Sequence, residues 1–74
     1  MDARTYETIV TEHKDRVYSY ASWMLRNRED ARDVSQDAMI RLWQHREKVL
    51  PESAKSWMLT TVHRLCLDRG KGPS

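Results

Sequence analysis

Apolar residues recur every three or four positions along most of this 74-residue chain, and that spacing limits its fold more than any other feature. Such a spacing places them on one side of an α-helix, whereas a strand would need strict alternation. The pattern predicts a first helix from about Thr5, whose hydroxyl can cap it, to about Arg26. Its recurring positions are Tyr6, Ile9, Val10, His13, Val17, Tyr20, Ala21 and Met24.

Two interruptions divide the chain into three helical segments. Asn27 ends the first segment and can cap a second one, which is predicted to run to about Lys48. The acidic residues of that segment lie towards its start and the basic residues towards its end, as the helix dipole favours. Pro51 then disfavours a helical conformation for Leu50 and predicts a short loop over residues 49–55. The core stripe of the second segment is Ala31, Val34, Ala38 and Leu42, with His45 left open.

The third segment is predicted to begin near Ser53 and to continue through Arg69. Gly70 suits the left-handed conformation that ends many helices. Residues 1–70 are therefore expected to form one domain, and residues 71–74 a frayed tail or the start of a linker. Three helices with short connections predict an all-α fold, a compact bundle in which a break inside the long first helix is left open. The apolar residues of the third segment are Trp57, Met58, Leu59, Val62, Leu65, Cys66 and Leu67.

Length and composition narrow the class of protein. A domain of 74 residues leaves little room for a deep enzymatic cavity. Its single cysteine cannot form an internal disulfide, which favours a reducing compartment, and no apolar stretch approaches the roughly 20 residues that span a bilayer. The net charge of +2 comes entirely from residues 51–74, a weak indication of a polyanionic partner. We expect a cytoplasmic, monomeric binding module without enzymatic activity, membrane contact or cofactor.

Three blocks of the sequence are more specific, namely residues 16–21, residues 28–43, and residues 57–59 with 65–69. In the middle block, Asp33 is followed by Val34 and Ser35, then by Gln36 and Asp37, and the block ends in Leu42 and Trp43. These blocks resemble the region-2 domain of extracytoplasmic-function sigma factors of the sigma-70 superfamily. The resemblance covers nearly the whole chain and implies the sigma-2 fold and a role in transcription initiation. Ser35 departs from the pattern, because the family usually has an apolar residue there.

The resemblance implies that the middle block docks onto the coiled-coil clamp helices of the β′ subunit of core RNA polymerase. Asp33, Gln36, Asp37 and Ile40 fall on one side of a helix, where they can meet one partner helix that presents Arg or Lys. Trp43 is assigned partly to packing and partly to this interface, and Trp23 to the bundle. Without the resemblance, the two aspartates would be interpreted simply as residues that favour the first half of a helix.

The third block resembles the segment that holds the single-stranded non-template strand of the promoter minus-ten element. That task needs cations for phosphates and flat groups for unstacked bases. Trp57 is left open between stacking and the core. The loop over residues 48–55 is shorter than in the family, and Arg64 stands where asparagine is common, so the base contacts stay open. The candidate DNA-binding residues are Lys55, Trp57, His63, Arg64 and Arg69.

Several alternatives are weighed beside this interpretation. One alternative is a sigma-like interaction module or decoy that binds an anti-sigma factor. Another is an unrelated three-helix reader of duplex DNA. An anti-sigma factor is also a candidate partner of a true initiation domain. His63 and Cys66 could share a helix face, but two ligands are not a metal site, so no metal is expected. Because a complete factor of this family also carries a C-terminal helix-turn-helix domain, we expect an isolated domain or a truncated form.

Overall fold

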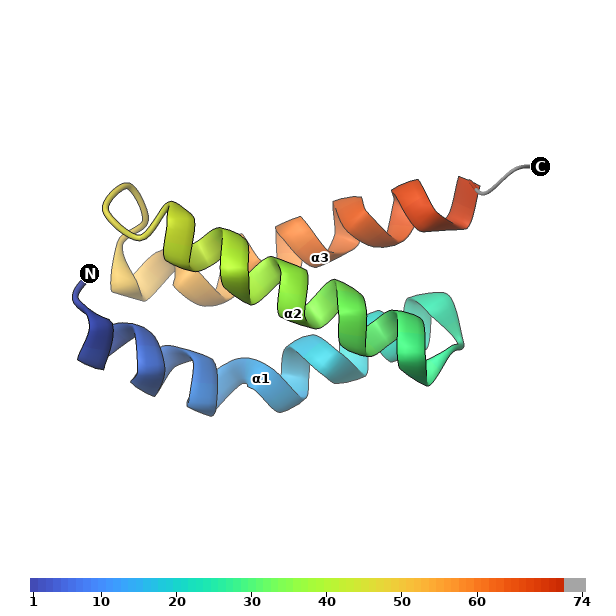
Figure 1. Ribbon diagram of the computed structural model, residues 1–74, viewed down its shortest axis with the longest axis horizontal. Coiled ribbons are helices and arrows are strands. Elements are labelled where there is room, and N and C mark those ends of the chain that lie inside the picture. The colour runs from blue at the N-terminus through green and yellow to red at the C-terminus, as the bar shows by residue number, and fades with distance from the viewer. Residues whose placement is uncertain (72–74) are drawn as a thin grey trace.

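The protein is described by a computed structural model that covers residues 1–71, and that part of the chain consists of helices and turns without strands. The helices are α1 (Ala3–Leu25), α2 (Arg28–Gln44) and α3 (Ala54–Lys71), with a single 3-10 turn, η1 (Pro51–Ser53), before α3. α2 runs back along α1, and α3 returns in the direction of α1 (Figure 1). This arrangement confirms the predicted all-α three-helix bundle.

α1 begins earlier than the sequence pattern predicted. The side chain of Asp2 accepts a 2.8 Å hydrogen bond from the backbone amide of Thr5, so Asp2 is the cap and Thr5 lies inside the helix. That hydrogen bond also lowers the pKa of Asp2. A carboxylate at this end also complements the helix dipole. α1 continues to Leu25 without a break, which settles the question left open for the first segment.

The connection between α1 and α2 is a tight turn of two residues. Arg26 adopts a left-handed conformation with φ 54°, and its amide donates to the carbonyl of Ser22. Asn27 then caps α2, because its side-chain oxygen accepts from the amide of Asp30 at 3.0 Å. The predicted cap at Asn27 is confirmed, and Glu29 and Asp30 lie in the first turn as the dipole favours.

Both ends of the second connection differ from the prediction. α2 ends at Gln44 and not near Lys48, because the chain turns at His45, whose carbonyl accepts from the amides of Lys48 and Val49. The turn brings the side chain of Val49 into the core. α3 passes through Gly70 to Lys71, so the predicted stop at Gly70 is wrong. Of the tail predicted over residues 71–74, Lys71 lies in α3 and residues 72–74 lie outside the described part of the chain.

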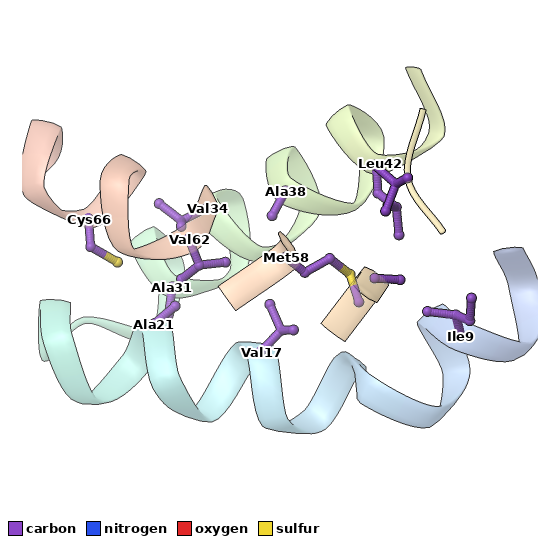
Figure 2. Packing of buried hydrophobic residues seen from close by; sticks show 12 residues of the cluster. Ile9, Val17, Ala21, Ala31, Val34, Ala38, Leu42, Met58, Val62 and Cys66 are labelled. Atoms are coloured by element: carbon purple, nitrogen blue, oxygen red, sulfur yellow. The ribbon is translucent and has the colours of Figure 1, made fainter. Parts of the chain in front are cut away.

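The core lies along the shared axis of the three helices (Figure 2). Alanines contribute from all three helices and have no exposed surface, so the backbones can approach closely where larger side chains would hold them apart. Leu42 and Met58 are the largest fully buried side chains. The buried apolar residues are Ile9, Val17, Ala21, Ala31, Val34, Ala38, Leu42, Val49, Ala54, Met58, Val62 and Cys66.

Three side chains lie where the sequence pattern did not place them. Trp23, which was assigned to the bundle, is 75% exposed, and Leu67 of the predicted apolar set is 48% exposed. Ser35 is buried in the core stripe of α2, where its hydroxyl donates a 2.7 Å hydrogen bond to the carbonyl of Ala31. The serine therefore occupies the usual apolar position without leaving an unsatisfied polar group.

Candidate functional site

The outer face of α2 carries the residues that were predicted to bind a partner helix. Asp33, Gln36, Ile40 and Trp43 are exposed, and Asp37 is half-buried at one margin. Spacings of three and four keep them on the side of the helix opposite the core stripe. Ile40 is 55% exposed, and carboxylates and an amide surround it. An apolar residue within a polar rim is typical of a protein–protein interface.

Aromatic side chains pack together at the edge of α2 that faces α1. The ring of Trp43 lies edge-on to that of Tyr6, with centroids 4.9 Å apart, and the hydroxyl of Tyr6 donates a 2.7 Å hydrogen bond to the carbonyl of Met39. Burial raises the pKa of Tyr6. From the other side, the guanidinium of Arg46 lies 3.8 Å from the Trp43 ring centroid. Trp43 is therefore held by packing, and 37% of it stays exposed.

The edge of α2 that faces α3 is charged. Arg41 pairs with Asp37 at 3.1 Å, one turn away on the same helix. Arg69 of α3 reaches across to Asp30 at 2.9 Å and to Asp33 at 4.0 Å. Arg69 was predicted to contact DNA, but here its guanidinium contacts the acidic start of α2. All of these side chains are substantially exposed, so the pairs are weak and exchangeable.

Beyond the Asp37–Arg41 pair, α2 and α3 bound an open groove of about 650 Å³. Trp57 and Arg64 line it from α3, Arg41 lines it from α2, and His45 lines it from the turn after α2. The rings of His45 and Trp57 lie 5.7 Å apart at an angle of 54°. Trp57 is half-buried against the core and also reaches the groove, so both of the roles left open for it are compatible with its position.

The remaining two candidate DNA-binding residues lie elsewhere. The Nδ1 atom of His63 is hydrogen-bonded at 2.8 Å to the hydroxyl of Tyr20 on α1, and Trp23 packs against the same tyrosine. Lys55 is half-buried near the start of α3, about two helical turns before His63, and lies outside the groove. Of the five residues, only Trp57 and Arg64 therefore share one groove.

Comparison with known proteins gives the family of this domain. Residues 9–71 match the sigma-70 region 2 family. The chain belongs to that family. It is 30% identical over 64 residues to the ECF RNA polymerase sigma factor SigE of Mycolicibacterium smegmatis, covering 86% of this chain and 25% of that protein. It is also 30% identical over 70 residues to the ECF RNA polymerase sigma factor SigK of Mycolicibacterium vanbaalenii, covering 92% of this chain and 36% of that protein.

This region-2 domain therefore spans between a quarter and about a third of the curated relatives that it matches. No solved structure gives a significant match. The family assignment agrees with the three-helix fold and with the sequence blocks in α1, α2 and α3, since the matched residues include all three blocks.

The loop of this region-2 domain, residues 45–53, adds a second hollow beside the groove. It has a volume of about 430 Å³ and shares His45, Ser53 and Trp57 with the larger groove. Leu50 at the tip of the loop is 61% exposed. The short loop therefore opens on the same side of the molecule as Trp57 and Arg64.

Cys66 contributes to packing in this region-2 domain. The thiol is buried, and burial raises its pKa, although Arg69 opposes that shift. Its sequence neighbour His63 is engaged with Tyr20. Within residues 1–71 no group of three or more His, Cys, Asp or Glu side chains is placed to hold a metal ion. Across the same residues, every helix is too short or too polar to cross a membrane.

Four contributors to these surfaces were assigned to no site from the sequence: Tyr6, Arg41, His45 and Arg46. A signal for two of them was present, because Arg41 lies four residues after Asp37 and His45 four residues after Arg41, a spacing that puts each residue close to the previous one in a helix. For Tyr6 and Arg46 the sequence offers no comparable signal, since their roles depend on how α1 and the turn after α2 approach Trp43.

Proposed function

We propose that this region-2 domain acts in transcription initiation by docking onto the β′ clamp helices of core RNA polymerase through the outer face of α2. The observation that carries the proposal is the row of exposed Asp33, Gln36 and Ile40 with half-buried Asp37 on one helix face within the family-matched residues. The relatives are named RNA polymerase sigma factors, which supports a polymerase as the partner.

The existing contacts of that face are compatible with docking. Arg41 and Arg69 already hold the carboxylates of Asp37 and Asp33, but exposed ion pairs contribute only about 0–1 kcal/mol each. A partner helix that presents Arg or Lys can replace them at little energetic loss. The apolar surface of Ile40 and the fixed ring of Trp43 then supply the water-excluding contacts from which most binding energy comes.

We further propose that the domain holds the single-stranded non-template strand of the promoter minus-ten element. Trp57 and Arg64 support this step, because they lie in one groove that also opens to the loop before α3. Stacking of a base on an aromatic ring contributes about 1–3 kcal/mol, and an arginine beside it can pair with the adjoining phosphate. The chemistry of RNA synthesis then belongs to the polymerase.

The polymerase step is tested by the binding of the domain to a purified β′ clamp-helix fragment. An Asp33→Ala, Gln36→Ala, Asp37→Ala triple variant should lose binding, and Ile40→Ala should weaken it. Glu12→Ala, Asp15→Ala is the matched control, because it removes two exposed carboxylates from α1 and should bind as the wild type does. Binding that survives the triple variant, with folding checked by circular dichroism, would refute docking through this face.

A second candidate function is that of an interaction module that binds an anti-sigma factor and contacts little DNA. The specific observation in its favour is that Arg69 is engaged with Asp30 and His63 with Tyr20, so two of the five candidate DNA-binding residues already have partners within the domain. Measured binding to single-stranded promoter DNA separates the two functions, because the interaction module needs none.

A further inference from the structure

The groove between α2 and α3 is built from both helices, although the sequence pointed only to α3. Arg41 lies in the last turn of α2 and His45 directly follows that helix, whereas Trp57 and Arg64 lie two turns apart on α3. The two pairs form rows on either side of the groove. A ligand that lies in the groove therefore meets side chains of both helices.

The charge of the groove favours an anion near its centre. Arg41 bonds Asp37 through its Nε atom only, so the two Nη groups of the same guanidinium can face the groove, and half of the side chain is exposed. Because Asp37 accepts the hydrogen bond from Nε, the planar guanidinium of Arg41 is held in one orientation. The direction of its remaining N–H donors is therefore partly fixed before a ligand binds. Arg64 is exposed on the α3 side. Asp68 is the one acidic residue among the described residues that line the groove, beside the two arginines Arg41 and Arg64.

The other lining groups suit a nucleic-acid strand in particular. Ser53, Ser56 and Thr60 supply hydroxyl donors, which commonly bind phosphate oxygens without regard to base sequence. The tilted pair of His45 and Trp57 offers aromatic surface at the same place. Cations, hydroxyls and an aromatic surface together are the composition of a site for single-stranded nucleic acid.

We propose that Arg41 of α2 and His45 of the turn after it complete the strand-binding site, with Arg41 contacting a backbone phosphate and His45 packing beside the base held on Trp57. The proposal rests on the proposed strand-binding function. It adds the α2 side of the groove to the surface that the strand contacts. The strand follows the groove between α2 and α3, and it does not follow the surface of α3 outside the groove, where His63 and Lys55 lie. It also places Arg41 next to Asp37, so the strand site adjoins the polymerase-docking face.

The test is the fluorescence anisotropy of a labelled single-stranded oligodeoxynucleotide of minus-ten sequence, titrated with the domain at several salt concentrations. The variants are Arg41→Ala, His45→Ala and Arg64→Ala. Arg32→Ala is the matched control, because Arg32 is an exposed arginine of α2 outside the groove. Loss of one phosphate contact should weaken binding and reduce the slope of log K against log salt by about 0.7 for Arg41→Ala, with no change for Arg32→Ala.

Since Arg41→Ala also leaves Asp37 unpaired, a double Asp37→Asn, Arg41→Ala variant separates direct contact from repulsion by the freed carboxylate. Arg41 contacts phosphate if the reduced slope persists in the double variant. Recovery of the wild-type slope overturns that contact. His45→Ala should weaken binding without changing the slope, and unchanged affinity overturns its role.

The outcomes also separate this proposal from the one on which it rests. If Arg64→Ala weakens binding while Arg41→Ala behaves like Arg32→Ala, strand binding stands and the contribution of α2 is wrong. If the wild-type domain binds no oligonucleotide, the inference fails together with the strand-binding step. The polymerase-docking step is unaffected in that case, because the β′ fragment assay tests it independently.

Discussion

The two edges of α2 are held to their neighbours by different kinds of contact. Towards α1, the contacts are aromatic and partly buried, with Tyr6 packed against Trp43 and hydrogen-bonded to the carbonyl of Met39. Towards α3, the contacts near the surface are exposed ion pairs that Arg69 makes with Asp30 and Asp33, and a groove opens beside the Asp37–Arg41 pair within α2. One edge of α2 is therefore joined to its neighbour by aromatic packing, and the other edge is joined to its neighbour by exposed ion pairs.

The difference shows how so small a domain can offer two binding surfaces. Partly buried aromatic contacts exclude water and hold Trp43 in place, which suits a surface that must meet a protein partner as a rigid body. Exposed ion pairs contribute little to stability and can be exchanged for contacts with a ligand. We infer that the α1 edge stabilises the fold and holds Trp43 in place for the docking face, whereas the α3 edge is available for binding the strand.

The largest effect should come from the core that lies beneath both edges. Leu42→Ala should lower the free energy of unfolding by about 2–5 kcal/mol, because it removes a fully buried side chain and leaves a cavity. Ile40→Ala, two residues away on the exposed face, should change it by no more than about 0.5 kcal/mol. Urea unfolding followed by circular dichroism measures both. Equal losses for the two variants would show that the outer face of α2 is a structural surface.

A smaller effect is expected at the α1 edge. Tyr6→Phe keeps the ring against Trp43 but removes the hydrogen bond to the carbonyl of Met39, so the free energy of unfolding should fall by about 0.5–1.5 kcal/mol. Tyr18→Phe, which changes a half-buried tyrosine of the same helix, is the control and should have a smaller effect. A Tyr6→Phe variant as stable as the wild type in the same urea experiment would mean that the hydrogen bond to the carbonyl of Met39 does not stabilise this edge.

The smallest effect is expected at the α3 edge. Arg69→Met removes the ion pairs with Asp30 and Asp33 and should lower the free energy of unfolding by less than about 1 kcal/mol. The difference from the wild type should shrink when thermal unfolding is repeated in 1 M salt, where the screening length is about 3 Å. A loss larger than that of Tyr6→Phe, and independent of salt, would reverse the comparison between the two edges.

The sequence determined the features of this protein that depend on neighbouring residues. The helical period gave three helices and the buried stripe of Ala31, Val34, Ala38 and Leu42, and Asn27 was recognisable as a cap because the group that it satisfies lies three residues away. The family was recognisable for a similar reason, since its characteristic residues form continuous blocks. The exposure of Trp23 could also have been predicted, because it follows buried Ala21 by two residues and is turned about 200° from it around the helix.

Only the tertiary structure decided which side chains meet across helices. Arg69 contacts Asp30, His63 contacts Tyr20, and Arg41 joins Arg64 in one groove. Such contacts depend on the rotation of each helix about its axis and on the angle at which two helices cross. Those quantities are set by the packing of the whole core, with its alanines at the close approaches, and not by the order of residues within any one segment. The helices are therefore local properties of this sequence, whereas its binding surfaces are a property of the bundle.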